Sequence, residues 1–586
     1  MSDASFDLRS IQKVPYLSRQ IIPYIGNKRR LIPLIHRGLL EAFPKGFRGK
    51  TFLDPFAGSG VVSRFAKYLG FEVFSNDWEV YSYLSSFAYL KINRRDLPDM
   101  YAPWGGMDGM LAHINNLPPP AGEDEYIARY YSPRDDAHAD YRRERLFYTR
   151  ANGCTIDGMR NEIERLYPFS IKSPSVDAVY SEVTLSKDGA YREKSLLLAL
   201  LLHGAATHTN TSGVFKAYHK GFGGFTGDAL SRIMKPIVLR WPVLWDSDHP
   251  QHIFMMDAVL LLEHLDKQVF DIAYLDPPYN QHQYGSNYHL LNTIALWDGM
   301  HPGDRETGGK AGIRKDWVVT RSDYCYRDRA PRAFGALLDR LHARYIFISY
   351  STEGIIPFDV LMERCASHGK VGLLTNEYVK YRGGRQSIHR LNHNVEFIIM
   401  IDTTRHTVPS DLEAIDDTVT ARKLNLQTKR SYVRTRLQQH FSIDTGYERV
   451  GFMVGGKTIW IETRGFLKLE ETDLSALIDC TGLTVSQRRK AKERLLAALQ
   501  QCQCRDRVEE LQEVMGLVME NRDDRQVFAA LIPDILRKIA HRKYREIFMD
   551  SLSAIRGLER RIPAVYRRIA GKIDGIEELA RKRFAG

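Results

Sequence analysis

The sequence has few cysteines and no long apolar run. Six cysteines occur among 586 residues, and none belongs to paired Cys-x-x-Cys motifs at zinc-finger spacing, so we expect reduced thiols, no disulfide framework and no bound metal. The longest aliphatic run, residues 195–206, is too short to cross a bilayer. Residues 1–10 contain no apolar signal segment. These absences predict a cytoplasmic protein that neither binds a metal nor enters a membrane.

Positive charge is in surplus over negative charge. The chain has 83 Lys and Arg against 71 Asp and Glu, a formal net charge of +12, and more than half of that excess lies in residues 401–586. The surplus suits a polyanionic partner such as nucleic acid, but by itself it argues for solubility and association only. Because 44% of the residues are hydrophobic, the chain can bury sizeable cores, and its length indicates several domains.

Strand-like and helix-like segments alternate early in the chain. Residues 51–56 form a short apolar run closed by Pro and Gly, residues 61–70 have helical spacing, and residues 71–77 form a second apolar run that ends in an acid. This order is typical of the first half of a doubly wound α/β sheet. Further buried strands are predicted at residues 268–279, 343–351 and 394–402.

The spacing of these strands divides the chain into four predicted segments. A Pro- and Gly-rich stretch follows the second strand, and residues 156–167 then have helical spacing, which indicates an insertion in the sheet domain. A Gly-Gly turn favours a hairpin over residues 451–463, followed by charged helical sequence. The segments are 1–95 and 201–404 as the two parts of the sheet domain, 96–200 as a mainly helical insertion, and 405–586 as a mostly helical C-terminal domain.

The sharpest local motif is Asp276-Pro277-Pro278-Tyr279, at the end of a predicted strand. The carboxyl end of a strand is where open α/β sheets bind ligands. Two prolines fix the backbone and leave carbonyl groups free to accept hydrogen bonds. Asp276 and the Pro277 carbonyl could accept the two hydrogens of an exocyclic amino group, while Tyr279 stacks on the base. A simple turn that closes the strand is the alternative.

Other motifs accompany this one in a fixed order. Residues 24–31 read YIGNKRRL, residues 52–60 read FLDPFAGSG, residues 75–77 read SND, and DPPY follows at 276–279. Over residues 20–402 the chain resembles amino-group DNA methyltransferases of the Dam-like, D12 adenine-N6 type with the alpha-group motif order. The resemblance implies a Rossmann-like methyltransferase fold that uses S-adenosylmethionine, and a site-specific enzyme that flips an adenine out of double-stranded DNA.

The resemblance also implies which residues form the site. Asp276, Pro277, Pro278 and Tyr279 would be catalytic. The cofactor would be bound by Tyr24, Lys28, Asp54, Phe56, Gly58, Gly60, Asp77, Asp257 and Asp276. In this scheme Asp77 would bind the ribose hydroxyls, and Lys28 would bind the cofactor carboxylate. A helix N-cap remains the alternative for Asp257, and a solvated basic face remains the alternative for the Lys28 segment.

Basic and aromatic residues in the insertion are candidates for DNA contact. We expect Arg142, Arg143, Arg145 and Arg150 to contact phosphates or guanine edges, with a solvated helix face as the alternative. Asn280 and Tyr284 lie in the loop after the DPPY motif, which suits closure over the base. The segment 405–586 either binds DNA or docks a protein partner.

Competing functions differ in their chemical requirements. A cytosine-C5 methyltransferase needs a Pro-Cys nucleophile, and no cysteine follows a proline here. A dehydrogenase would not require the DPPY motif. An adenine-N6 methyltransferase acting on RNA and a cytosine-N4 DNA methyltransferase stay open. The expected setting is restriction-modification, phage defence or orphan methylation.

Overall fold

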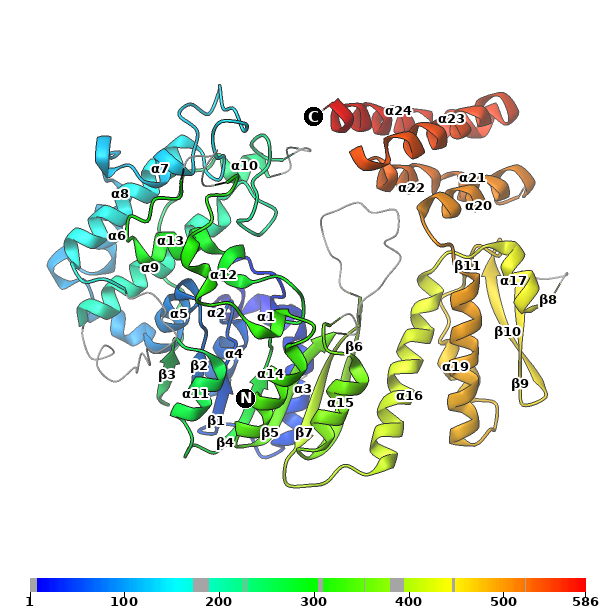
Figure 1. The fold of residues 1–586 in the computed structure, drawn as a ribbon, viewed down its shortest axis with the longest axis horizontal. Coiled ribbons are helices and arrows are strands. Elements are labelled where there is room, and N and C mark those ends of the chain that lie inside the picture. The colour runs from blue at the N-terminus through cyan, green and yellow to red at the C-terminus, as the bar shows by residue number, and fades with distance from the viewer. Residues whose placement is uncertain are drawn as a thin grey trace. The chain divides into compact units, whose positions relative to one another are not determined.

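The chain forms two compact units. The computed structural model describes residues 8–171, 189–224, 227, 229–303, 309–351, 354–379, 395–444, 448–521 and 523–585. The first unit comprises Met1–Glu377 and Glu396–Val408, and the second comprises Tyr378–Val395 and Pro409–Gly586. Figure 1 labels their elements.

The first unit is built on a seven-stranded sheet with the order β3-β2-β1-β4-β5-β7-β6. Strands β1 to β5 pair in parallel, and β7 pairs antiparallel with β5. The strands are β1 (Thr51–Asp54), β2 (Glu72–Asn76), β3 (Gln251–Phe254), β4 (Phe270–Leu275), β5 (Ala343–Ser351), β6 (Lys370–Val379) and β7 (Val395–Asp402). A mixed α/β fold with a mostly parallel sheet is therefore confirmed.

The strand order reverses between β1 and β4, which lie side by side at the centre of the sheet. The chain leaves β1 toward β2 on one side and leaves β4 toward β5 on the other. Such a reversal opens a crevice outside the carboxyl ends of the strands. Asp54 ends β1 and Asp276 directly follows β4. The two acids therefore meet at this crevice.

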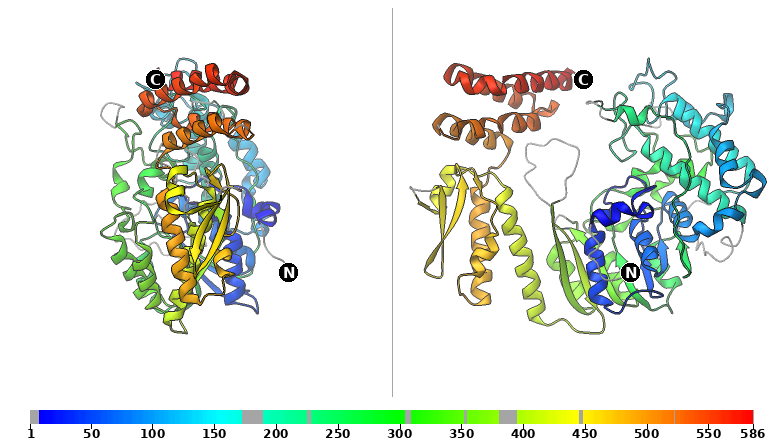
Figure 2. Two further views of the ribbon diagram at one scale, coloured as in Figure 1. Left: turned by 90° about the vertical axis from the view of Figure 1, so that its right-hand side faces the viewer. Right: turned by 180° about the vertical axis from the view of Figure 1, so that it is seen from behind.

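Helices cover both faces of the sheet. Helices α3 (Ile32–Ala42) and α4 (Val61–Leu69) lie on one face, which is turned to the viewer in the right-hand view of Figure 2. The other face carries α11 (Ala258–His264), α14 (Ala330–Arg340) and α15 (Phe358–Ala366). Helix α4 ends at Gly70, whose positive φ of 88° caps it.

Five predicted strands and the first predicted helix are confirmed, within the described residues, by β1, β2, β4, β5, β7 and α4. Two strands, β3 and β6, were missed. Both lie at the edges of the sheet, where one side of a strand has no neighbour and apolar residues are less continuous. Their sequences, QHIF and KVGLLTNEYV, mix polar and apolar residues for this reason.

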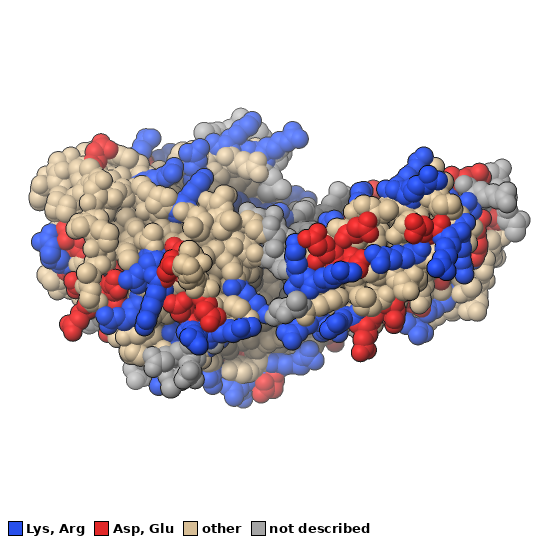
Figure 3. Space-filling model, turned by 90° about the horizontal axis from the view of Figure 1, so that it is seen from above, with Lys and Arg blue, Asp and Glu red and all other residues tan. Residues whose placement is uncertain are grey.

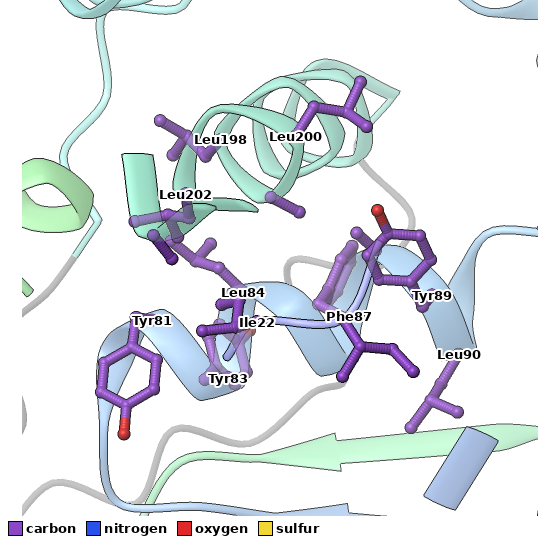
Figure 4. Close-up of a cluster of buried hydrophobic side chains, with 14 of the residues drawn as sticks. Ile22, Tyr81, Tyr83, Leu84, Phe87, Tyr89, Leu90, Leu198, Leu200 and Leu202 are labelled. Atoms are coloured by element: carbon purple, nitrogen blue, oxygen red, sulfur yellow. The ribbon is translucent and has the colours of Figure 1, made fainter. Parts of the chain in front are cut away.

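Further helices extend the core of this unit. Helix α9 (Gly189–Thr207) is buried along most of its length and contacts α5 (Val80–Ser86), α8 (Arg150–Leu166) and α13 (His289–Leu296). Figure 4 shows α9 lying across α5 and the π-helix η2 (Phe87–Lys91), with leucine and aromatic side chains in one cluster. The remaining helices are α1 (Leu8–Lys13), α2 (Pro15–Ser18), α6 (Met107–Asn115), α7 (Ile127–Tyr130), α10 (Leu230–Ile233) and α12 (Tyr284–Asn287).

The second unit combines helices with a small sheet of order β11-β10-β9-β8. The predicted hairpin is confirmed by β9 (Arg449–Val454) and β10 (Lys457–Arg464), which Gly455 and Gly456 join at positive φ. The flanking strands are β8 (Ser442–Asp444) and β11 (Lys468–Leu469). The helices are α16 (Pro409–Asn425), α17 (Arg434–His440), α18 (Leu474–Asp479), α19 (Val485–Cys502), α20 (Arg507–Glu520), α21 (Arg525–Ala529), α22 (Ile532–Ile539), α23 (Arg545–Arg561) and α24 (Pro563–Ala585).

Candidate active site

A cavity opens at the carboxyl ends of β1, β2 and β4. Of the residues predicted from sequence, twelve line it: Tyr24, Lys28, Asp54, Phe56, Gly58, Asp77, Asp257, Asp276, Pro277, Pro278, Tyr279 and Tyr284. They come from segments up to 260 residues apart, and the reversal of strand order brings them together. Gly60 does not line the cavity, and instead lies at the N-cap of α4 with φ 71°.

The loop after β1 approaches the cavity as bare backbone. Gly58 has φ 54°, and a Cβ atom there would lie 2.8 Å from the ring of Tyr24. The Gly58 N–H donates to Asp77 Oδ2 at 2.7 Å, and the Glu79 N–H donates to Asp77 Oδ1 at 2.9 Å. Burial raises the pKa of Asp77, and these two backbone donors oppose that rise. The loop therefore orients the Asp77 carboxylate toward the cavity.

Asp54 lies deep in the cavity wall. Its Oδ2 accepts a 2.6 Å hydrogen bond from the Ser63 hydroxyl on α4. Burial raises the pKa of Asp54 to about 7, although the bond to Ser63 lowers it. Asp54 therefore titrates close to neutral pH.

The catalytic candidates are joined to the N-terminal motif by an ion pair. Lys28 is buried, and its Nζ lies 3.1 Å from Asp276 Oδ1 and 4.8 Å from the centre of the Tyr279 ring. Burial lowers the pKa of Lys28, but Asp276 and Tyr279 together raise it by more, so the net shift of the pKa is upward. Lys28 is therefore charged, and the alternative of a solvated basic face is wrong for this residue.

A stack of tyrosines forms one wall of the cavity. The Tyr24 ring lies 5.2 Å from the ring of Tyr284 and 4.9 Å from the ring of Tyr288, with interplanar angles of 14° and 11°. The Tyr288 hydroxyl accepts a 2.7 Å hydrogen bond from the N–H of Ile25. The stack fixes the YIGNK segment against the loop that follows DPPY.

Asp257 serves as a helix cap and as a lining residue. Its Oδ1 accepts from the N–H groups of Val259 and Leu260 at 2.8 and 3.3 Å, at the start of α11. The N-cap alternative is therefore confirmed, while the side chain also borders the cavity. Tyr324 also lines the cavity, and its ring packs edge-on against Phe56 with 5.3 Å between the ring centres.

The sequence analysis did not name Glu79 or Tyr324, which also line the cavity. Glu79 is buried, and its Oε2 accepts a 2.6 Å hydrogen bond from Asn292 on α13. Burial raises its pKa to about 7 against the lowering by that bond. The position of Glu79, two residues after Asp77, was the available signal. Tyr324 follows no motif, because only the folded chain brings its loop to the cavity.

Two of the four predicted DNA-contacting arginines, Arg145 and Arg150, hydrogen-bond to backbone carbonyl groups of other segments. Arg145 is buried and donates to the carbonyl oxygens of Tyr130, Gly303 and Gly309 at 3.1, 2.8 and 3.1 Å. The guanidinium of Arg145 therefore links three loops of the protein, a structural role that the sequence did not predict. Arg150 is partly exposed, donates to the Ala128 carbonyl at 2.9 Å and pairs with Glu125.

The remaining DNA-contact candidates lie on the surface. Arg142 is exposed and lies 5.5 Å from the centre of the Tyr141 ring, with Lys220 at 5.2 Å from the same ring. Arg143 is exposed. Asn280 Oδ1 accepts a 3.0 Å hydrogen bond from the His282 N–H, and Asn280 is not among the cavity-lining residues.

Across the described ranges, the structure contains no group of three or more His, Cys, Asp or Glu that could hold a metal ion. Within those same residues, no helix is both long and apolar enough to span a membrane.

A mostly parallel sheet, a glycine loop after its first strand and an Asp-Pro-Pro-Tyr turn after its fourth together are consistent with an α/β enzyme of the methyltransferase type. Residues 24–168 and 245–308 match the family model described as D12 class N6 adenine-specific DNA methyltransferase. Over these residues the chain is therefore similar to adenine-specific DNA methyltransferases of the D12 class.

Curated relatives are named as Type II methyltransferases or modification methylases. Type II methyltransferase M.NlaIII of Neisseria lactamica is 29% identical over 384 residues, which are 65% of this chain and 99% of that protein. Modification methylase LlaI of Lactococcus lactis is 29% identical over 64% of this chain and 54% of its own length. Type II methyltransferase M.FokI of Planomicrobium okeanokoites is 29% identical over 59% of this chain and 47% of its own. The chain thus spans about half the length of the latter two.

Proposed function

We propose that this protein transfers the methyl group of S-adenosylmethionine to the N6 amino group of an adenine that is flipped out of double-stranded DNA. The observation that carries this proposal is one cavity lined both by the glycine loop with Asp77 and by Asp276 with Tyr279. A methyl donor and an acceptor base could therefore meet inside one cavity, which is what a direct transfer requires.

The residues of the loop suit the methyl donor. A side chain at Gly58 would meet the Tyr24 ring, so the glycine lets the loop backbone and this tyrosine lie close together beside the cavity. Each Asp77 oxygen accepts one backbone N–H and has a lone pair left for a ribose hydroxyl. When bound, S-adenosylmethionine supplies an electrophilic methyl group on a sulfonium centre.

The DPPY turn suits the acceptor base. Asp276 and the Pro277 carbonyl would accept the two N6 hydrogens, which draws the nitrogen lone pair out of the ring system. Tyr279 would stack on the extruded base, a contact worth about 1–3 kcal/mol, which offsets part of the few kcal/mol that base flipping costs. Catalysis would then rest on positioning and on electrostatic activation of the amino group.

The basic surface around Tyr141 suits the DNA backbone. Arg142 and Lys220 both lie beside the Tyr141 ring, and Lys310 lies 5.5 Å from the neighbouring Tyr218 ring. These residues come from three separate loops and would neutralise phosphates together. Arg143 belongs to the same loop as Arg142, and the proposal includes it.

The relatives named as Type II methyltransferases and modification methylases support a role in modifying host or phage DNA inside the cell. The test is to express the gene in a host without background adenine methylation and to sequence its methylome. N6-methyladenine at one recurring sequence is expected, and a host that expresses Asp276→Ala should lack it. Methylation found only in RNA, or only at cytosine N4, would contradict the proposal.

A further inference from the structure

Lys28 occupies two of the three contacts that the proposed reaction assigns to the target base, those with Asp276 and Tyr279. Its ammonium lies 3.1 Å from Asp276 Oδ1, where the amino group of the base would donate. The same ammonium lies over the ring of Tyr279, 4.8 Å from its centre, where the base would stack. Lys28 and the base therefore compete for one acceptor and one aromatic surface.

The segment that carries Lys28 is anchored to the cofactor side of the cavity. Asn27 caps the short helix that begins at Lys28, accepting from the Arg29 N–H at 2.9 Å. The Asn27 amide also donates to the Ser59 hydroxyl in the glycine loop at 3.3 Å. The backbone at Lys28 is thus fixed beside the glycine loop, while its four-carbon side chain can change direction.

A buried ammonium needs an anionic partner, because desolvation without one costs several kcal/mol. Lys28 can leave Asp276 only if the cavity offers another negative charge. Among the lining acids, Asp54 Oδ2 accepts from Ser63, Asp77 accepts from the backbone and Glu79 accepts from Asn292. Outside the lining, Glu396 also raises the pKa of Lys28. A bound amino acid carboxylate would be a new acceptor.

We propose that Lys28 keeps the base pocket closed in the free protein and opens it when the carboxylate of S-adenosylmethionine draws its ammonium away from Asp276. This inference rests on the proposed function and adds an order to it, with the methyl donor entering before the base is flipped. Lys28 is a positioning residue in this scheme, since it acts on the base through Asp276 and Tyr279.

The test measures base flipping and not methyl transfer. A duplex carries 2-aminopurine, whose fluorescence rises on unstacking, at the position methylated in the host. Full-length protein binds it with S-adenosylhomocysteine, which has the carboxylate, or with saturating 5′-methylthioadenosine, which lacks the amino acid group. For the unaltered protein we expect on the order of fivefold more fluorescence with the first ligand, because only a ligand that binds the open state better shifts the equilibrium.

The Lys28→Met variant removes the ammonium and keeps the side-chain length. Its fluorescence should be equally high with both ligands, and its KM for DNA should fall while its KM for S-adenosylmethionine rises. Lys28→Arg should restore the difference between the ligands. A variant that still needs the carboxylate, or that flips with neither ligand while binding S-adenosylhomocysteine, would overturn the proposal.

A matched control comes from a second lysine in the same unit. Lys50 Nζ lies 3.1 Å from Asp271 Oδ1 and 5.0 Å from the Phe43 ring, so it makes the same two kinds of contact outside the cavity. Lys50→Met should leave the fluorescence difference between the two ligands unchanged. If Lys50→Met alters that difference as Lys28→Met does, the effect comes from general destabilisation, and the proposed role of Lys28 is overturned. Methyl transfer to the adenine duplex by the unaltered protein tests the proposed function separately.

Discussion

At the scale of single residues, Asp276 has two successive partners in the proposed reaction, first Lys28 and then the N6 amino group. Replacing it with Ala removes both interactions but leaves the Pro-Pro turn that shapes the backbone. We expect Asp276→Ala to lose at least about 100-fold in kcat, as for other preorganised charge-stabilising groups. A methylation assay with saturating substrates measures this, and the exposed Asp266→Ala serves as the control. Near-normal turnover would refute the catalytic role.

Asp77 has a different expected effect, on binding of the methyl donor. Its two oxygens are oriented by the Gly58 and Glu79 N–H groups. Losing a charged acceptor for two ribose hydroxyls should weaken binding roughly 10- to 100-fold, given about 1.5–3 kcal/mol for hydrogen bonds to charged groups. Calorimetry with S-adenosylhomocysteine measures the change, with Asp77→Asn expected to lose less than Asp77→Ala. Unchanged affinity in both variants would exclude the ribose role.

The buried Glu79 carboxyl group should make the stability of the fold depend on pH. Burial, opposed by the Asn292 hydrogen bond, raises its pKa from 4.5 to about 7. The folded chain therefore holds this proton more tightly than the unfolded chain, so the stability associated with it is present below about pH 4.5 and is lost as pH rises toward 7. Glu79→Gln should remove up to about 3 kcal/mol of that loss. Urea unfolding at several pH values should show the free-energy gap between the two proteins widening with pH; parallel curves would contradict the assignment.

At the scale of elements, the central strands were predictable because each is a continuous apolar run closed by turn residues, as at β1 and β4. The edge strands β3 and β6 were not predicted, because their sequences, QHIF and KVGLLTNEYV, mix polar with apolar residues and contain no such run. The motif residues were found because they directly follow those central strands. Tyr324 and the structural role of Arg145 were not predicted, because both depend on contacts between loops that are distant in sequence.

The loops that surround Tyr141 give a prediction at this scale. Arg142 and Lys220 flank one ring, so both would contact phosphates if the surface binds DNA. The double variant Arg142→Ala, Lys220→Ala should bind DNA more weakly, and the slope of log affinity against log salt should become shallower by about 2. Arg165→Ala is the control, since Arg165 is also exposed but pairs with Glu162 on α8. An unchanged slope in the double variant would exclude this surface from the DNA interface.

At the scale of the whole molecule, the second unit contains much of the positive excess, yet many of its basic side chains have acidic partners. On α23 and α24, Arg556 and Arg581 both pair with Glu577, and Lys582 pairs with Glu578. Figure 3 shows basic and acidic side chains intermixed on the face of this unit that it displays. Intermixed charge weakens the attraction of a surface for a uniform polyanion. Docking of a protein partner therefore competes with DNA binding as the role of residues 409–586.

A chain shortened to residues 1–408 separates these roles. Every residue that lines the cavity belongs to the first unit, so binding of S-adenosylhomocysteine should stay within about twofold of the full chain, a difference near RT ln 2. If the second unit binds phosphates, the shortened chain should bind DNA more weakly and with a shallower salt slope, by about 0.9 for each phosphate that it no longer neutralises. If it docks a protein, DNA affinity and methylation should both persist. Loss of cofactor binding together with loss of cooperative unfolding would instead show that the first unit depends on the second for its own stability.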